Sequence, residues 1–332
     1  MQRMKDLGRV VVAAAATVLA LAPQAAAEDL LKVAVAQRGA WETAAPHLGQ
    51  QAGIFKKHGI VLDLTYADED TELPVISGNA DVGVGVGVMD VLRAYTGKDP
   101  SLRIIGANMT GSANYWYVAA TSPIKKVKDI SFRSIAYSKA DQYDMFDFLD
   151  RFGLKPRPVM ISGETAAFDQ VMAGKIDVGW ATPPLGVDAL EEDRIRIVAK
   201  ASEVPKIRDK TVSVMIANAD TLQQRGDALA RFVQAYRETI DWMYADPVAP
   251  KAYAEFADMP ERRARRLRDE FFTKDMLSPD KIVGLSVIAK DAAKLKYIRA
   301  SMSTKQLTEL VQVPAPLKSS GGWLRIFSPR SP

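Results

Sequence analysis

The chain has 332 residues, of which 44 are Lys or Arg, 40 are Asp or Glu, two are His and none is Cys. This length suits two domains or one elaborate domain, and a hydrophobic share of 48% with a charged share of 25% is ordinary for a globular protein. The absence of cysteine excludes disulfide scaffolds, thiolate metal sites and cysteine nucleophiles. The net charge of +4 is too small for this length to indicate a nucleic-acid partner.

The first 27 residues have the layout of a secretory signal. Arg3, Lys5 and Arg9 form a basic start, residues 10–22 are almost wholly apolar, and small residues lead up to Ala27. A signal peptide has an apolar core of about 7–15 residues, whereas a helix that spans a membrane needs about 20. We therefore expect cleavage after Ala27 and export to the periplasm, with an uncleaved N-terminal anchor as the alternative.

The segment that follows alternates between short apolar runs and amphipathic stretches. The apolar runs predict strands at residues 32–37, 61–66, 81–87 and 102–107. Helices are predicted at residues 43–59, in a short stretch ending at Ser77, and at residues 89–95. A regular strand–helix alternation favours a largely parallel sheet covered by helices.

The same pattern occurs a second time. Strands are predicted at residues 134–138, 159–162, 177–181 and 195–199, and helices at residues 141–152, 166–173 and 186–190. The clearest match between the two passes is Gly-Asn-Ala-Asp-Val-Gly at residues 78–83 against Gly-Lys-Ile-Asp-Val-Gly at residues 174–179. Because the match falls at the same point of both series, we interpret the chain as two similar α/β lobes.

Two extended segments, residues 113–130 and 211–217, suit a chain that crosses to the second lobe and returns. The rest is predicted to be helical at residues 228–244, 250–257, 261–272, 279–298 and 304–311. We therefore expect a signal peptide at 1–27, lobe one at 28–115 and 212–312, lobe two at 116–211, and a flexible tail at 313–332. Each lobe is expected to hold a largely parallel sheet flanked by helices.

Few residues suggest catalysis or metal binding. Both histidines, His47 and His58, belong to one predicted helix, and the nucleotide-binding glycine pattern fails because its third position is Val88. The acidic cluster at residues 68–72 either caps the following helix or faces a ligand. The arginines of residues 262–268 form a solvated helix face or, as the alternative, contact an acidic membrane partner. No catalytic residue, metal ligand or cofactor is predicted.

Glycine and aromatic residues gather where predicted strands end. Gly83, Gly85 and Gly87 either expose backbone N–H groups to a ligand or soften a strand that packs on a helix. Aromatic residues follow strand ends at Trp41, Tyr66, Tyr143 and Trp180, and another group lies at the first crossing, at residues 115–117. Ligands of open parallel sheets bind beyond the carboxyl ends of the strands, so we expect some of these rings in a site, although most aromatic residues pack in cores.

Two stretches carry a family resemblance. Residues 44–60 (AAPHLGQQAGIFKKHGI) and residues 76–83 (ISGNADVG) resemble the periplasmic solute-binding proteins of ABC importers, in particular the nitrate/sulfonate/taurine-type group, which is related to thiamine-pyrimidine synthases. The resemblance covers about residues 31–311. It implies a type II periplasmic-binding-protein fold, a cleft that closes on one small solute, and delivery of that solute to a membrane permease.

The resemblance also implies which residues line the cleft. By position, the candidates in lobe one are Gln37, Arg38, Trp41, Asp70, Gly85, Val86, Gly87, Val88, Thr110, Gly111 and Ser112. The candidates in lobe two are Ser138, Lys139, Asp141, Gly163, Glu164, Trp180 and Thr182. The implied partners are a small-molecule ligand and an ABC permease, with no nucleic acid and no membrane contact except through the permease, and the protein is expected to be a monomer.

The sequence departs from the family's pattern at three places. Val88 and Met89 stand where relatives often have hydroxyls, an acidic run at residues 68–70 replaces a Gly-Ser-like turn, and residues 137–141 replace an Arg-Gly-Ser-Thr-like opening. Hydroxyls and Arg suit an oxyanion, whereas added carboxylates repel one. We therefore expect an aromatic, neutral, zwitterionic or amine-bearing ligand. The alternatives are an exported enzyme that uses a cleft carboxylate such as Glu164 or Asp141, and a ligand sensor that docks on a membrane receptor.

Overall fold

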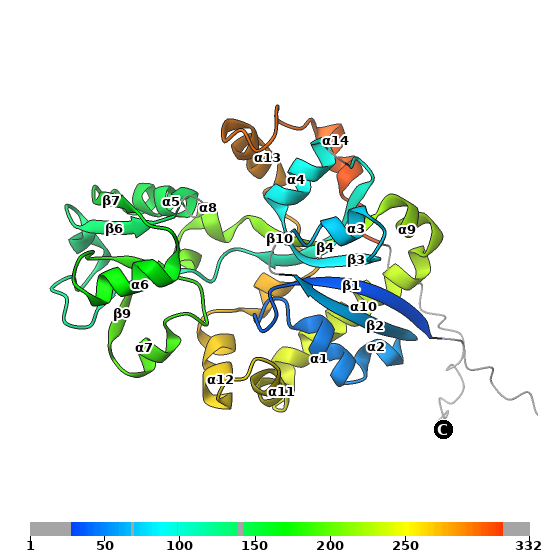
Figure 1. Ribbon diagram of the computed structural model, residues 1–332, viewed down its shortest axis with the longest axis horizontal. Helices are drawn as coiled ribbons and strands as arrows, with labels where there is room; N and C mark the ends of the chain where they lie inside the picture. Colours follow the sequence, from blue (N-terminus) through cyan, green and yellow to red (C-terminus); the bar gives the residue numbers. More distant parts are fainter. Residues whose placement is uncertain (1–27, 68–69, 98, 139–141, 315–332) are drawn as a thin grey trace, which may run out of the picture.

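The computed structural model describes residues 28–67, 70–97, 99–138 and 142–314 (Figure 1). The predicted signal peptide and almost all of the predicted tail lie outside these residues. Within the described part of the chain, no helix is both long and apolar enough to cross a membrane.

The first sheet has five strands in the order β2-β1-β3-β10-β4. They are β1 (Asp29–Ala36), β2 (Ile60–Ala67), β3 (Val82–Gly87), β4 (Leu102–Thr110) and β10 (Thr211–Asn218). β1 is parallel to β2 and β3, whereas β10 is antiparallel to both of its neighbours, β3 and β4. The central strands read as nearly continuous apolar runs because helices cover both faces of the sheet.

Two groups of helices cover this sheet (Figure 1). On one face lie α1 (Ala45–Gln51), α2 (Ile54–Lys57), α10 (Gly226–Ala245) and α11 (Ala249–Phe256). On the other lie α3 (Leu73–Ile76), α4 (Val88–Gly97), α13 (Leu285–Lys294) and α14 (Thr304–Leu310). Each group packs its apolar side on the strands, so the sheet separates two hydrophobic cores. The helix α9 (Ala219–Gln224) follows β10, and α12 (Glu261–Glu270) follows α11.

Two predicted helices are shorter than expected. The single helix expected at residues 43–59 is broken into α1 and α2 at Gly53, which has a left-handed φ of 75°. The helix expected from Pro279 begins only at Leu285, after Gly284 with a φ of 76°. A left-handed residue cannot continue a right-handed helix, and glycine takes that conformation without a steric penalty.

The second lobe repeats the order of the first. Its strands are β5 (Tyr115–Ala119), β6 (Ser134–Tyr137), β7 (Arg157–Met160), β8 (Gly179–Ala181) and β9 (Ile195–Lys200). β8-β5-β9 and β6-β7 are joined by a parallel bridge between Ile135 and Val178, which places the strands in the order β7-β6-β8-β5-β9. Its helices are α5 (Gln142–Phe152), α6 (Glu164–Met172), α7 (Val187–Glu191) and α8 (Pro205–Arg208). Both lobes therefore place the strand of a crossing antiparallel between the third and fourth strands of a strand–helix series.

The repeated hexapeptide has one task in both lobes. Asp81 accepts a hydrogen bond from Lys32 N at 2.8 Å, and Asp177 accepts one from Ser134 N at 2.9 Å. In each lobe, the aspartate just before the third strand of the series accepts a hydrogen bond from a backbone N–H of the first strand of that series. The internal repeat predicted from the sequence is thus visible in strand order and in hydrogen bonding.

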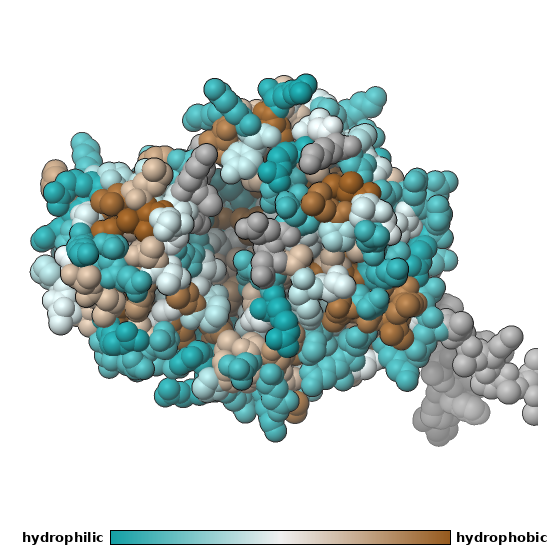
Figure 2. Space-filling model, viewed as in Figure 1, coloured by the Kyte–Doolittle hydropathy of each residue, from teal (hydrophilic) through white to brown (hydrophobic). Residues whose placement is uncertain are grey.

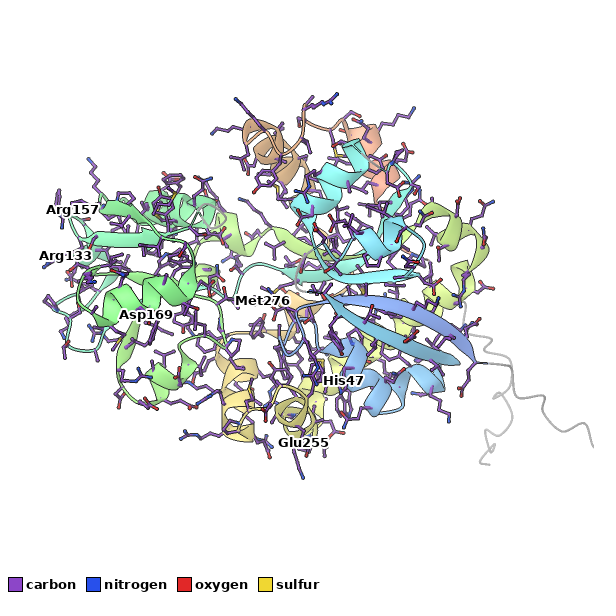
Figure 3. All side chains as sticks on the ribbon, in the orientation of Figure 1. His47, Arg133, Arg157, Asp169, Glu255 and Met276 are labelled. Atoms are coloured by element: carbon purple, nitrogen blue, oxygen red, sulfur yellow. The ribbon has the colours of Figure 1, made fainter. Side chains whose placement is uncertain are left out.

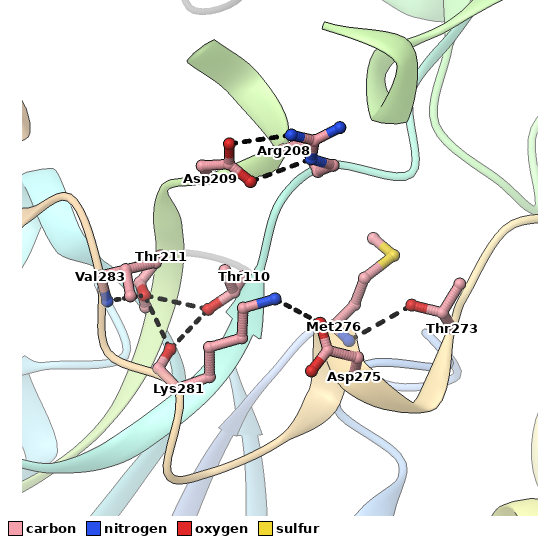
Figure 4. Close-up of polar contacts among 9 residues, drawn as sticks. All are labelled: Thr110, Arg208, Asp209, Thr211, Thr273, Asp275, Met276, Lys281 and Val283. Atoms are coloured by element: carbon pink, nitrogen blue, oxygen red, sulfur yellow. Dashed lines mark hydrogen bonds and ion pairs between the residues drawn. The ribbon is translucent and has the colours of Figure 1, made fainter. Parts of the chain in front are cut away.

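The two crossings between the lobes contact each other. Gly111, with a φ of 86°, donates its N–H to Lys210 O at 2.7 Å. The Thr110 and Thr211 hydroxyls lie 2.9 Å apart, and both reach Lys281 O, as Figure 4 shows. A third segment, the loop before α13, therefore ties the crossings together. The division of the chain at 115/116 and 211/212 stays a prediction.

Candidate functional site

A cavity of about 540 Å³ lies between the two lobes, beside the carboxyl ends of β1 and β3. The space-filling view is hollowed between the lobes (Figure 2). We call this cavity the acidic cavity. Its described lining consists of Ala36, Gln37, Glu42, Thr43, Asp70, Thr71, Glu72, Gly85, Val86, Gly87, Asp90, Asn108, Met109, Ser112, Asn114, Asp144, Val212 and Ser213. Among these described residues, Asp144 alone belongs to the second lobe.

Carboxylates dominate the charge of this cavity. Its described lining holds five of them, namely Glu42, Asp70, Glu72, Asp90 and Asp144, and holds no Lys, Arg or His. Unit charges of one sign repel strongly where protein reduces the effective dielectric constant. Negative charge therefore predominates among the described lining residues, an arrangement that suits a cation better than an anion.

The pKa of Glu42 is strongly perturbed. Burial raises the pKa of its carboxyl from 4.5 to about 7, and its Oε2 atom has no hydrogen-bond partner within the described part of the chain. Two tyrosines near it donate elsewhere: Tyr236 Oη donates to Asn108 Oδ1 at 2.9 Å, and Tyr253 Oη donates to Gly39 O at 2.8 Å. Neither phenolic proton is left for Glu42, so among the described residues its Oε2 atom is buried without a hydrogen-bond donor.

Two further carboxylates share one cation. Arg93 Nη2 lies 3.0 Å from Asp90 Oδ1 and 3.6 Å from Glu72 Oε1. Burial raises the pKa of Asp90, the Arg93 charge opposes this shift, and the Asp70 charge adds to it. Arg93 does not line the cavity, so it partly neutralises Asp90 and Glu72 from outside the lining.

The glycines of β3 shape the wall of the cavity. Gly85 has a φ of 81°, and a Cβ placed there would lie 2.7 Å from Thr43 Cγ2 and 3.1 Å from Ala36 Cβ. At Gly87, a Cβ would lie 2.8 Å from Asp90 Oδ2, so the Asp90 carboxylate folds back over this backbone. Asp90 stands in the first turn of α4, where the helix dipole favours a negative group. The glycine run therefore brings a carboxylate to the helix N-terminus that an anionic ligand would need.

Two lining residues have left-handed backbones without being glycine, Gln37 with a φ of 46° and Asp70 with a φ of 52°. Such conformations cost of order 1–3 kcal/mol and gather at ligand sites, where the surrounding structure imposes them. At Gln37, the Thr43 hydroxyl contributes by donating to Gln37 O at 2.9 Å. The loop between β1 and α1 is thereby held against the cavity.

The structure brings six of the sequence-predicted residues together in this cavity. They are Gln37, Asp70, Gly85, Val86, Gly87 and Ser112. Val88 lines a neighbouring cavity instead. Thr110 and Gly111 lie at the crossings, where they line a small cavity of about 210 Å³ with Ser112.

Two predicted residues of the first lobe lie apart from the cavity. Trp41 is buried in the core, where its Nε1 donates to Tyr244 Oη at 3.1 Å and its ring meets Tyr253 edge-on. Arg38 is exposed and lies over the Phe256 ring, on which His47 also stacks. Burial and the Arg38 charge lower the pKa of His47.

In the second lobe, Glu164 and Thr182 lie together. Thr182 donates its N–H to Glu164 Oε2 at 2.9 Å, and its hydroxyl lies 2.6 Å from Glu164 Oε1 and 2.7 Å from the Asn114 side chain. Since one hydroxyl has one proton, it donates to Glu164 and accepts from the Asn114 amide when that amide is turned with its nitrogen toward Thr182. The pair thus reaches the acidic cavity through Asn114, which lines it.

The other described candidates of the second lobe do not line the acidic cavity. Gly163 precedes α6, Ser138 is buried at the end of β6, and Trp180 is buried within the sheet. Lys139 and Asp141 lie outside the described residues. Whether any predicted residue contacts a ligand stays a prediction.

Sequence reasoning missed most of the charged and amide lining. Glu42 is adjacent to a residue that was singled out, Asp90 lies in the first turn after the glycine run, and Asp144 lies in the first turn of α5. First-turn acidic residues directly after strand ends were the available signal. Asn108 carries no such signal, because it lies within the predicted strand region instead of at a strand end. In the structure it is a fully buried residue of β4, and its side chain donates to Ser213 Oγ at 3.0 Å.

The remaining motifs lie elsewhere. His58 contacts Glu238 at 2.8 Å, away from the cavity. The arginines of α12 form ion pairs, and Arg263 reaches across to Glu191 of α7 at 3.1 Å, so this face is more than a solvated surface. Within the described residues, no group of three or more His, Asp and Glu is placed to hold a metal ion.

A two-lobed α/β architecture with a cavity at strand ends defines the periplasmic-binding-protein class of fold. Solved structures agree: the periplasmic aliphatic sulphonate-binding protein of Escherichia coli is 15% identical, with a TM-score of 0.63 over 91% of this chain and 98% of that one. A Candida albicans protein described as having the generic periplasmic binding protein fold is 15% identical, with a TM-score of 0.58 over 88% and 99%. The predicted fold class is confirmed.

Residues 43–249 match the family model described as NMT1/THI5 like, and because this is more than half of the chain, the protein belongs to that family. A 4-amino-5-hydroxymethyl-2-methylpyrimidine phosphate synthase of Saccharomyces cerevisiae is 22% identical over 232 residues, or 65% of this chain. The chain spans 66% of that relative's length, slightly under two thirds. The family resemblance expected from residues 44–60 and 76–83 is confirmed.

Proposed function

We propose that this protein is an extracytoplasmic solute-binding protein that captures a small amine-bearing cation in the acidic cavity and delivers it to an ABC-type permease. The observation that carries the proposal is a described lining with five carboxylates and no basic side chain. The sequence left aromatic, neutral, zwitterionic and amine-bearing ligands open. A cavity of this charge, with no aromatic residue in its described lining, favours the last of these.

The arrangement also gives a reason for the lobes to close on a cation. Glu42 and Asp90 belong to lobe one, whereas Asp144 faces the same cavity from α5 of lobe two. Closing an empty cavity would bring these carboxylates nearer to one another at a cost in repulsion. A cation between them converts the repulsion into attraction, so closure becomes conditional on the ligand's charge.

The setting we propose is the periplasm, with the protein acting as a monomer after removal of residues 1–27. We propose lobe one as residues 28–115 and 212–312 and lobe two as residues 116–211. The separate sheets support this division. β1 to β4 and β10 form one sheet, whereas β5 to β9 form the sheets of the second lobe.

Native mass spectrometry of freshly purified protein, followed by calorimetric titration, tests the proposed function. We expect a co-purified amine or, failing that, binding of butylamine and no binding of butanesulfonate. Asp90→Asn is expected to weaken butylamine binding about 10- to 100-fold, because a hydrogen bond to a charged group contributes about 1.5–3 kcal/mol. Asp63→Asn, which removes the same charge from an exposed position on β2, is the matched control. Sulfonate binding that Asp90→Asn leaves unchanged would overturn the proposal.

Binding should depend on pH in a defined direction. Below pH 7 a growing fraction of Glu42 is protonated and neutral, so we expect butylamine to bind about tenfold more tightly at pH 8 than at pH 6. A primary amine stays protonated over this range, so the change reports the protein. Titration in buffers of different ionisation enthalpy should show a proton released on binding near pH 7. Uptake of a proton, or no pH dependence, contradicts the role given to Glu42.

The yeast relative is named a synthase, which gives an enzyme alternative a specific basis. The two functions differ in the fate of the ligand. A binding protein stabilised by a hundredfold excess of ligand over Kd gains about 2.7 kcal/mol of stability, and the ligand is recovered unaltered. Conversion of the co-purified compound during incubation would favour the enzyme.

A further inference from the structure

A chain of side-chain hydrogen bonds connects helix α10 to the wall of the acidic cavity. Tyr236 Oη of α10 donates to Asn108 Oδ1 at 2.9 Å, and Asn108 Nδ2 donates to Ser213 Oγ at 3.0 Å. Tyr236 and Asn108 are fully buried, whereas Ser213 is half-buried. Asn108 and Ser213 both line the cavity. We call Tyr236, Asn108 and Ser213 the tyrosine relay.

The place of Ser213 in the sheet brings its hydroxyl near a carboxylate of the same cavity. β10 pairs Ser213 with Gly87 of β3 in an antiparallel register, and paired residues of such strands direct their side chains to the same face. A Cβ on Gly87 would lie 2.8 Å from Asp90 Oδ2. The Ser213 hydroxyl and the Asp90 carboxylate therefore belong to neighbouring parts of the cavity wall.

The direction of the tyrosine relay decides where its spare proton lies. The orientation of the Asn108 amide is assigned from its hydrogen bonds. With Oδ1 toward Tyr236, the phenolic proton is used, and Ser213 accepts from Asn108 with its own proton left over. With the amide turned over, Ser213 would donate to Asn108, and the spare proton would lie on the Tyr236 hydroxyl.

Burial favours the first of these orientations. A fully buried donor without an acceptor loses the hydrogen bond that water would have given it, and the Tyr236 hydroxyl has no second acceptor among the described residues. A hydroxyl that lines a cavity can donate to water or to a ligand instead. The relay therefore keeps its spare proton on Ser213, and no described residue accepts that proton.

We infer that Ser213 donates a hydrogen bond to the solute, that Tyr236 positions Ser213 through Asn108, and that the solute is an amine that also carries an acceptor oxygen. The inference rests on the proposed function and deepens it, because it adds an ether or hydroxyl group to the amine. Ionised carboxylates accept hydrogen bonds and cannot donate them. Ser213 therefore distinguishes an oxygen from a methylene group at the same place in the solute.

Calorimetric titration of the mature protein at pH 8 with matched pairs of amines tests this. The pairs are 2-methoxyethylamine with butylamine, and 3-methoxypropylamine with pentylamine. The two members of a pair have the same charge and the same chain length, and they differ only in an oxygen that replaces a methylene group. We expect the ether of at least one pair to bind about two- to tenfold more tightly than its alkyl partner, because one net hydrogen bond contributes this much.

Variants of the tyrosine relay assign the preference to its members. Ser213→Ala is expected to abolish the preference for the ether. Tyr236→Phe removes the proton that holds Asn108 Oδ1, so the amide can turn and take the Ser213 proton, and we expect a smaller preference. Adding Tyr236→Phe to Ser213→Ala should not change the preference further. Tyr253→Phe is the matched control, because it removes another buried hydroxyl, which donates to Gly39 O at 2.8 Å, and should keep the preference.

The outcomes separate this inference from the proposed function. If neither ether binds more tightly than its alkyl partner, Ser213 does not donate to the solute, and the amine-binding function stands. If the preference persists in Ser213→Ala, another group supplies it, and the role of Ser213 is overturned. If Tyr236→Phe keeps the full preference, the phenol does not position Ser213. If none of the amines binds, the proposed function fails and the inference fails with it.

Discussion

At pH 8, Glu42→Gln is expected to raise the free energy of unfolding of the ligand-free protein by about 3 kcal/mol. Burial holds the pKa of Glu42 near 7, against an ordinary value of 4.5. Between these two values the folded protein binds the proton more tightly than the unfolded chain does. The stability that Glu42 contributes is therefore fully present below about pH 4.5 and is lost as the pH rises through 7. Glutamine keeps the shape and removes the buried charge.

Under the proposed function, the same substitution should weaken the binding of a cationic ligand at pH 8, because it removes a negative charge from the lining of the acidic cavity. The gain in stability should shrink as the pH is lowered and vanish below about pH 4.5. Denaturant unfolding at several pH values, with butylamine titration alongside, measures both effects. Glu255→Gln on α11, at an exposed position, is the control and should change neither quantity (Figure 3). Loss of stability at pH 8 on Glu42→Gln would contradict the assignment of a buried, uncompensated carboxylate.

Gly85→Ala is expected to destabilise the protein by about 2–4 kcal/mol. Of this, about 1–2 kcal/mol comes from placing a Cβ on a left-handed backbone, and the rest from crowding against packed neighbours. Those neighbours are Thr43 and Ala36, whose nearest atoms lie 2.7 and 3.1 Å from the new Cβ. Because both line the acidic cavity, ligand affinity should also fall.

A second glycine separates the two causes. Gly53 has a similar φ of 75°, but a Cβ added there would meet no atom within 4 Å, so Gly53→Ala should cost only the conformational part. Urea unfolding of both variants gives the difference directly. Equal losses of stability would mean that crowding at the cavity wall contributes nothing.

Much of the fold could be predicted from the sequence because its signals are local. Alternating apolar runs and amphipathic stretches indicate strands and helices wherever the pattern is formed by neighbours in the chain. The repeated Asp-Val-Gly indicated the two lobes, since Asp81 and Asp177 have the same hydrogen-bonding role. The break at Gly53 was missed because an apolar stripe continues across it, and periodicity does not report the φ of one residue.

The site was predictable only in part. Gln37 and Asp70 were candidates because the family resemblance implies them, and both follow strand ends, where ligands of parallel sheets bind. Trp41 also follows a strand end, yet it turns into the core between Tyr244 and Tyr253, which are more than 200 residues away in the chain. Asp144 faces the cavity only because the second lobe is placed against the first. Such side-chain directions depend on long-range packing that a single sequence pattern does not contain.

The lining of the acidic cavity is distributed unequally, with Asp144 as the one described contribution of the second lobe. Under the proposed function, selectivity would therefore reside almost entirely in the first lobe, and the second lobe would add one carboxylate. Substitutions at Glu42, Glu72 or Asn108 would change which solute is bound and leave the outer surface of the second lobe as it is. Such a protein could acquire a new ligand without any change in the surface that a permease would contact.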